Sequence, residues 1–206
     1  MIEMAKVHSL VPIAPADASC SPYTAPKGEA FTVWMKSLVM QGNGCTVFNQ
    51  KGEIVYRIDN YEKKGSRKVF LMDLRGKVLF TIIQRKLRVF GRWEGYKCSE
   101  SDANDGKLWF CVKKGCPMFK RRSSCQVSVH CDKAQARCFN IESTAGKLEF
   151  SIVNRTGGLI AEGKRKQSSS GVYLGEDVLT LAVEPEVDHS LVVALVAVFG
   201  SMHRRM

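Results

Sequence analysis

Basic side chains are the residues of this sequence with the clearest potential for chemistry. Lysine and arginine bind phosphate groups through charge-assisted hydrogen bonds. Four clusters hold 16 of the 31 basic residues: Lys63, Lys64, Arg67 and Lys68; Arg85, Lys86, Arg88 and Arg92; Lys113, Lys114, Lys120, Arg121 and Arg122; and Lys164, Arg165 and Lys166. Together with a formal net charge of +11, this clustering predicts a surface that attracts polyanions such as nucleic acid or anionic lipid.

The second cluster also contains an aromatic residue. Alternate side chains of a strand share a face, so a strand through this cluster would carry Lys86, Arg88, Phe90 and Arg92 on one side. Such a stripe suits an inositol phosphate head group, with the aromatic ring in the interfacial region of the leaflet. The alternative is that these charges only keep a barrel exterior soluble. The candidate lipid- or phosphate-binding residues are Lys86, Arg88, Phe90, Arg92, Lys113, Lys114, Lys120, Arg121 and Arg122.

Cysteine and histidine show no pattern of a metal or catalytic site. Six cysteines between positions 98 and 138 lack the close pairs that zinc sites use, so we assign no metal ligand. The four histidines are scattered, and no nucleophile elbow, phosphate-binding glycine loop or metalloprotease motif occurs. We therefore expect no catalytic residue, no cofactor and no enzymatic activity. The absence of a secretory signal before these thiols indicates a reducing, intracellular compartment.

The elements that must position the basic residues are predicted to be short antiparallel strands. Apolar and polar residues alternate at 53–59, 108–112, 125–131 and 147–152, which is typical of strands with one buried face. The segments VFNQKGEIVYRI, LMDLRGKVLFTI and SIVNRTGGLIAE each place an Asn or Asp three residues before a Gly, which predicts a hairpin turn. With roughly ten strands, the sheet is expected to close into a barrel that leaves few edges unpaired.

The most apolar segment, HSLVVALVAVFG at 189–200, is predicted to be a helix. Its uninterrupted apolar run is far shorter than the about 20 residues that cross a bilayer, so we expect no transmembrane span. Asp188 is placed to cap the first turn and Gly200 to end the helix. Apolar residues cover every side, so the barrel is expected to enclose this helix. The structural residues of the helix are then Leu191, Val192, Leu195, Val196 and Phe199.

The chain is expected to contain one folded domain. Residues 1–28 are rich in Pro, Ala and Ser, a composition that forms neither helix nor sheet readily, and they predict a flexible tail. Residues 29–206 then form the barrel domain. We expect this domain to be a monomer.

Three long segments carry a family resemblance. They are FTVWMKSLVMQGNGCTVFNQKGEIVYRIDNY, VFLMDLRGKVLFTIIQRKLRVFGRWEGY and SSSGVYLGEDVLTLAVEPEVDHSLVVALVAVF, and together they resemble a plant LURP-one-related protein. The resemblance implies a fold similar to the tubby C-terminal domain and the phospholipid scramblases: a closed antiparallel barrel of about twelve strands around a central hydrophobic C-terminal helix. It also implies an association with basal defence against pathogens.

Three functions remain open from the sequence. The first is a non-catalytic module that docks on phosphoinositide-containing membranes and acts in plant defence signalling. The second is a nucleic-acid binder, including a membrane-tethered transcription regulator, although no recognition motif is evident. The third is a protein-interaction scaffold whose basic loops are regulated by phosphorylation of Ser123 or Ser168. These functions correspond to the cytoplasm, the periphery of the plasma membrane or the nucleus.

Overall fold

The protein is mainly β, with twelve strands and one C-terminal helix. A computed structural model describes residues 22–36, 44–59, 68–85, 91–98, 106–115, 122–130, 137–144 and 148–203. The elements are β1 (Glu29–Trp34), β2 (Gly44–Phe48), β3 (Ile54–Asp59), β4 (Lys68–Asp73), β5 (Val78–Arg85), β6 (Arg92–Lys97), β7 (Lys107–Lys114), β8 (Arg122–Val129), β9 (Arg137–Thr144), β10 (Phe150–Asn154), β11 (Leu159–Arg165), β12 (Val178–Val183) and α1 (His189–Met202).

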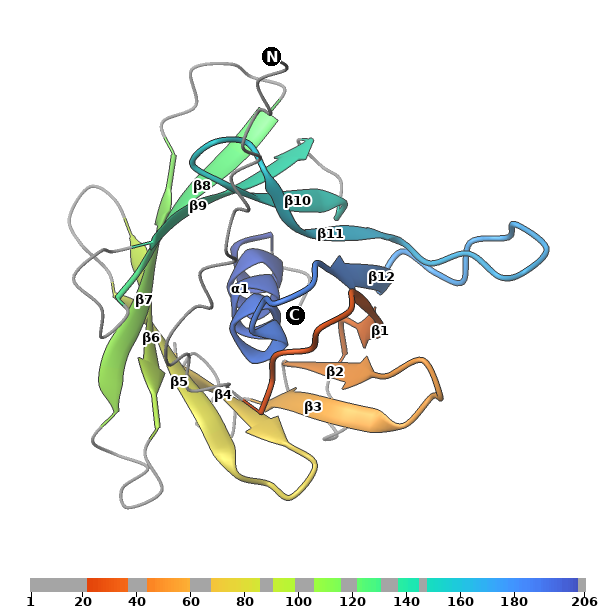
Figure 1. Cartoon of the computed structure of the whole chain (residues 1–206), viewed down its shortest axis with the longest axis horizontal. Coiled ribbons are helices and arrows are strands. Elements are labelled where there is room, and N and C mark those ends of the chain that lie inside the picture. Colours follow the sequence, from red (N-terminus) through yellow and green to blue (C-terminus); the bar gives the residue numbers. More distant parts are fainter. Residues whose placement is uncertain are drawn as a thin grey trace, which may run out of the picture.

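The twelve strands close into an antiparallel barrel. Each strand pairs with its neighbours in the chain, and β1 pairs with β12 to complete the ring (Figure 1). Closure leaves none of these strands as an unpaired edge, which removes a template for aggregation. The predicted barrel is confirmed. It has twelve strands, as the family resemblance implied, rather than the roughly ten expected from the alternation of apolar and polar residues.

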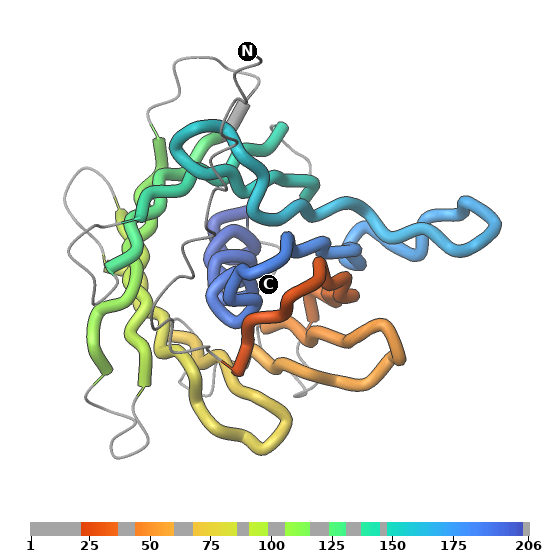
Figure 2. The backbone as a smooth tube through the Cα atoms, in the orientation of Figure 1, coloured from red at the N-terminus to blue at the C-terminus, as the bar shows by residue number. Residues whose placement is uncertain are grey.

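Helix α1 lies inside the barrel, as Figures 1 and 2 show. Every residue from Ser190 to Gly200 is buried, including the five predicted structural residues. The carboxylate of Asp188 accepts hydrogen bonds from the backbone N–H groups of Ser190 (2.9 Å) and Leu191 (3.3 Å), so the predicted N-cap is confirmed. An apolar helix is stable here because the strands exclude water from all of its sides.

The predicted end of the helix is wrong by two residues. Gly200 is buried within α1, which continues to Met202. The backbone N–H of His203 then donates to the carbonyls of Phe199 and Gly200, both at 3.2 Å, and closes the last turn. Gly200 remains helical because it still lies within the enclosed part of α1, where only intrahelical bonds satisfy its backbone.

Three hairpin turns have the predicted chemistry. Asn49, Asp73 and Asn154 each accept backbone N–H groups two and four residues later, at 2.8–3.0 Å. The glycine three residues after each has a positive φ, of 80° at Gly52, 78° at Gly76 and 86° at Gly157. These turns join β2 to β3, β4 to β5 and β10 to β11, and they set the register of the three hairpins.

Two glycines on the inner face of the wall make room for aromatic rings. Gly95 lies opposite Phe110, and Gly163 lies opposite Phe150. A Cβ atom at either glycine would overlap the ring of its cross-strand partner. The ring of Phe150 in turn packs against Phe199 of α1, with centroids 4.8 Å apart. Each glycine therefore lets a large side chain lie flat against the wall and fill space beside the helix.

We expect Val196→Asp to abolish soluble expression, because it buries an unpaired charge against the barrel wall at a cost of several kcal/mol. The matched control is Val172→Asp, since Val172 is 64% exposed. Soluble yield and thermal unfolding measure the difference. Equal yields of the two variants would show that α1 is not enclosed.

We expect Gly95→Ala to lower the free energy of unfolding by about 1–3 kcal/mol, because the added methyl displaces the Phe110 ring. Gly91→Ala is the control, since its Cβ would meet no atom closer than 3.7 Å. Urea unfolding measures both changes. Combining Gly95→Ala with Phe110→Leu should recover part of the loss, and a purely additive double variant would contradict the steric explanation.

Candidate functional site

The sequences of the connections at the two ends of the barrel differ in charge. Neighbouring strands are antiparallel all round the ring, so every connection from an odd-numbered strand to the next strand leaves from one end. We call this the basic end, because the sequences of those six connections contain 10 Lys and Arg against 4 Asp and Glu. The connections at the opposite end, with the segment before α1, contain 5 against 8. Helix α1 finishes at the basic end, where Met202 contacts Cys125 near the start of β8.

Three basic residues form a row near the basic end. Arg85 pairs with Arg92 across β5 and β6, and Arg92 pairs with Lys113 across β6 and β7. Their side chains lie on the outer face of the wall, since the adjacent Trp93 and Val112 are buried inside. We call Arg85, Arg92 and Lys113 the basic row. Like charges on adjacent strands repel, so the row requires a compensating negative charge.

That negative charge is Glu94, a buried carboxylate on the same face of β6. Its oxygens accept bonds from Arg85 Nε (3.0 Å), Arg92 Nη2 (2.5 Å) and the Tyr96 hydroxyl (2.7 Å). Burial alone would raise the pKa of Glu94, but the bonds from Tyr96 and Arg85 and the charge of Arg92 outweigh it and lower that pKa. Glu94 therefore stays ionised and fixes both guanidinium groups, which remain about half exposed to solvent.

The structure places part of the predicted candidate set. Arg92 and Lys113 belong to the basic row, and Lys114 lies exposed at the end of β7. Arg122 begins β8, although its side chain is outside the described residues. Lys86, Arg88, Phe90, Lys120 and Arg121 also lie outside them.

The single-strand stripe is wrong. Arg85 and Arg92 are paired neighbours on two antiparallel strands, so the chain reverses direction between them. One strand therefore cannot carry Lys86, Arg88, Phe90 and Arg92 together. The two-residue alternation correctly placed Arg92 on the outer face and Trp93 on the inner face of its strand. It did not reveal that the chain reverses between Arg85 and Arg92, because the intervening sequence has no Asn-Gly or Asp-Gly signal.

Sequence analysis missed three residues of this surface: Arg85 as part of the site, Glu94 and Tyr96. A signal was present for two of them, since Arg92, Glu94 and Tyr96 follow each other at the two-residue spacing of one strand face. Arg85 could join them only once the register of β5 against β6 was known.

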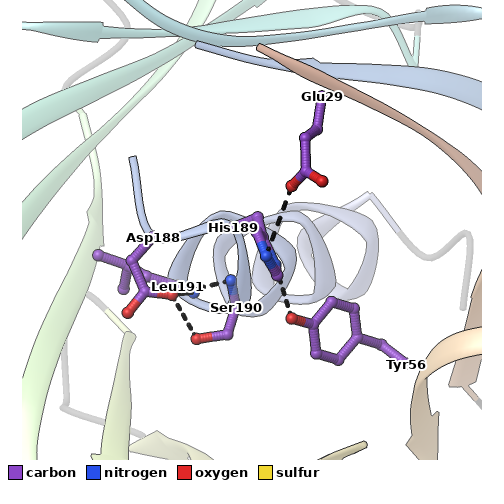
Figure 3. Close-up of polar contacts among 6 residues, drawn as sticks. All are labelled: Glu29, Tyr56, Asp188, His189, Ser190 and Leu191. Atoms are coloured by element: carbon purple, nitrogen blue, oxygen red, sulfur yellow. Dashed lines mark hydrogen bonds and ion pairs between the residues drawn. The ribbon is translucent and has the colours of Figure 1, made fainter. Parts of the chain in front are cut away.

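The opposite end of the barrel holds a buried polar cluster, drawn in Figure 3. The Tyr56 hydroxyl lies 2.6 Å from His189 Nδ1, and His189 Nε2 lies 3.5 Å from a Glu29 carboxylate oxygen. Burial lowers the pKa of His189 against the opposing charges of Glu29 and Asp188, and burial raises the pKa of Tyr56. Tyr56 is only 2% exposed, so this cluster fastens the start of α1 to β1 and β3 rather than presenting a reactive group.

The segment before β1 covers that same end. Thr24 forms a β-bridge with Asp188, and the backbone N–H of His189 donates to the Tyr23 carbonyl at 2.9 Å. The ring of Tyr23 packs edge-on against His189. Residues 22–28 therefore shield the start of α1, within the stretch that composition alone assigned to a tail.

A groove of about 670 Å³ crosses the outer face of β9–β12. Its lining mixes three carboxylates, Glu142, Glu149 and Glu162, with Lys164 and Arg165. Two of these charges already form an ion pair with each other, since Lys164 Nζ lies 2.7 Å from a Glu162 carboxylate oxygen. This mixed lining has no excess of positive charge, whereas the basic row carries three cations beside one carboxylate.

Comparison with known proteins identifies the family. The family model described as LURP-one-related matches residues 29–200, which include all twelve strands and most of α1. The chain belongs to the LURP-one-related family. The two expectations drawn from that resemblance about fold, a closed barrel and an enclosed helix, hold for this family member.

Several LURP-one-related proteins of Arabidopsis thaliana are similar to the chain over most of its length. It is 43% identical to Protein LURP-one-related 11 over 200 residues, which cover 94% of this chain and 86% of that protein. It is 46% identical to Protein LURP-one-related 4 over 188 residues, which cover 91% and 85%. An X-ray structure of another Arabidopsis thaliana protein has the same fold, with a TM-score of 0.63, 18% identity and coverage of 88% of this chain and 95% of that one.

The helix of this LURP-one-related chain is not a membrane span. Within the described residues, no helix has both the length and the hydropathy that crossing a bilayer requires.

We expect Glu94→Gln to lower the free energy of unfolding by about 1–3 kcal/mol at pH 7, because Arg85 and Arg92 lose their anionic partner. The pKa of Glu94 is below its ordinary value of about 4.3, so its stabilisation is complete above that pH and is lost as the pH falls through the folded-state pKa. Urea unfolding should therefore show a smaller difference between wild type and variant at about pH 3 than at pH 7.

Glu162→Gln is the control for this experiment, because its partner Lys164 is mostly exposed. We expect it to change stability by less than about 0.5 kcal/mol. A Glu94→Gln difference that stays constant from pH 7 to pH 3 would contradict the role given to the ionised carboxylate.

Proposed function

We propose that the chain is a non-catalytic binding module that docks its basic end on anionic membranes, with phosphoinositide head groups as the preferred ligands. The observation that carries the proposal is the basic row, Arg85, Arg92 and Lys113, three cations on adjacent strands at the end of the barrel with the basic connections. Phosphates on an inositol ring offer several acceptors a few ångströms apart, and adjacent strands place cations at a similar spacing of about 5 Å.

Glu94 supports this proposal through the orientation of the arginines. It binds Arg85 through Nε and Arg92 through Nη2, and both arginine side chains remain partly exposed, although Arg92 Nε is buried without a hydrogen-bond partner among the described residues. A guanidinium that is already oriented loses less entropy when it forms paired bonds to a phosphate. The two arginines of the row are therefore preorganised for an anion although the Glu94 carboxylate lies between them.

The expected attachment is reversible. Each Lys or Arg close to an anionic leaflet contributes about 1 kcal/mol, so three to six residues give binding that weakens as salt is raised. Anionic lipids are concentrated in the cytoplasmic leaflet, which makes that surface the proposed docking place. Regulated docking there agrees with the defence signalling that the family resemblance implies.

Nucleic acid is the competing polyanion, and one structural feature speaks against specific recognition of it. A helix that reads bases must enter a groove, whereas α1 is enclosed by the barrel. The basic row would then contact only phosphates, which gives non-specific, salt-sensitive affinity. Sequence-selective DNA binding that survives about 150 mM salt would favour the nucleic-acid function over membrane docking.

Vesicle flotation tests the proposal. We expect the triple variant Arg85→Gln, Arg92→Gln and Lys113→Gln to bind phosphoinositide-containing vesicles at least about tenfold more weakly than wild type, because three cations near the leaflet are removed. Glutamine retains a donor for Glu94, which limits the effect on folding.

The matched control removes the same charge from the opposite end, with Lys51→Gln, Arg75→Gln and Arg155→Gln in three hairpin turns. It should bind like wild type. Equal recovery of wild type with neutral and phosphoinositide vesicles at low salt would refute lipid docking altogether.

A further inference from the structure

The connection between β11 and β12 is an ordered hairpin arm. Residues 166–177 extend away from the barrel in Figures 1 and 2. The backbone N–H of Leu174 donates to the Lys166 carbonyl at 3.0 Å, and that of Ser168 donates to the Val172 carbonyl at 2.8 Å. Gly171 has a φ of 79° and closes the tip through a bond to the Ser168 carbonyl. The arm therefore holds its shape through its own hydrogen bonds.

The returning side of this arm, which follows the polar turn at Ser168–Gly171, exposes three consecutive apolar residues. Val172 is 64% exposed, Tyr173 48% and Leu174 54%. Within the described part of the chain, the other exposed large hydrophobic residues are Leu74 and Leu159, in two separate hairpins at the opposite end. Exposing three apolar side chains to water on a projecting hairpin is unfavourable unless a membrane or a protein surface covers them.

Cations flank the base of the arm on the side of β11. Lys164, Arg165 and Lys166 lead into it, and the guanidinium of Arg165 stacks over the Tyr173 ring, 4.2 Å from its centroid. Lys166 contacts the Thr32 hydroxyl on β1. Two acidic residues, Glu176 and Asp177, lie at the other side of the base, and Asp177 is bound by Lys36 at 2.9 Å and by the Trp34 indole N–H at 3.3 Å. The arm thus combines an exposed apolar side with cations where it leaves β11.

We propose that this arm inserts into the membrane: Val172 and Leu174 enter the interfacial region of an anionic leaflet, while Arg165 and Tyr173 lie at the head groups. The inference rests on the proposed membrane docking and adds the element that penetrates the bilayer. A lipid surface fits better than a protein pocket because the exposed apolar residues are few and three cations, Lys164, Arg165 and Lys166, lie next to them where the arm leaves β11. Tyrosine also favours the membrane interface.

Insertion supplies what the basic row lacks. Electrostatic attraction alone is lost at high salt, and a small apolar anchor alone binds weakly, but the two together give stable attachment. The arm leaves from the basic end, so it and the basic row belong to the same end of the barrel. The combined contact should therefore retain a salt-resistant part.

The test compares two double variants on vesicles of phosphatidylcholine with phosphatidylserine and a phosphoinositide. Val172→Ser with Leu174→Ser should bind about tenfold more weakly than wild type, and the loss should persist at 0.5 M salt, because apolar burial is not screened. The matched control, Leu74→Ser with Leu159→Ser, removes exposed apolar residues at the opposite end and should bind like wild type. Thermal unfolding of both should match wild type.

A second measurement separates insertion from contact with the surface. The tryptophan added by Val172→Trp should be quenched by lipids brominated on their acyl chains, and that added by Leu74→Trp should not. If wild type fails to bind anionic vesicles, membrane docking and arm insertion are both wrong. If wild type binds but the arm variants bind equally well, or Val172→Trp is not quenched, the insertion proposal is wrong and docking through the basic row stands.

Discussion

The structure depends on filling the interior of a twelve-stranded barrel. A barrel of about eight strands is just wide enough for side chains to fill, and twelve strands leave a wider space that would otherwise hold water against apolar walls. Helix α1 occupies that space, with Ser190 to Gly200 fully buried. A helix in this position must be apolar on every side, and this requirement explains the composition of the C-terminal segment. Gly95 and Gly163 belong to the same solution, since they allow the Phe110 and Phe150 rings to lie flat beside the helix.

A sealed interior leaves the outside and the two ends of the barrel for function. Antiparallel pairing brings basic residues from three strands, Arg85, Arg92 and Lys113, side by side on the outer face of the barrel. The family relation to other LURP-one-related proteins covers the whole of this framework, from β1 into α1. The starting end of α1 is covered by Tyr23, Tyr56 and His189, whose rings contact one another there.

Much of the fold was predictable from local chemistry, and much of the site was not. The Asx turns at Asn49, Asp73 and Asn154 and the cap at Asp188 use interactions within four residues, so the sequence displays them directly. The contact of Arg85 with Glu94, in contrast, depends on the register of two strands across a turn that carries no strong signal. The same missing turn made the basic stripe appear continuous. The helix end moved because enclosure by the barrel overrides the local preference of Gly200.

The position of α1 in the chain has a consequence for biosynthesis. A ribosome makes all twelve strands before it makes the element that fills their interior. Until translation reaches the helix, the apolar inner faces of the strands have no permanent partner, and the nascent polypeptide is a natural client for chaperones that shield such surfaces. A stop codon upstream of residue 189 would therefore produce the barrel strands without the helix that fills them. We expect such a product to be degraded rather than to keep partial activity.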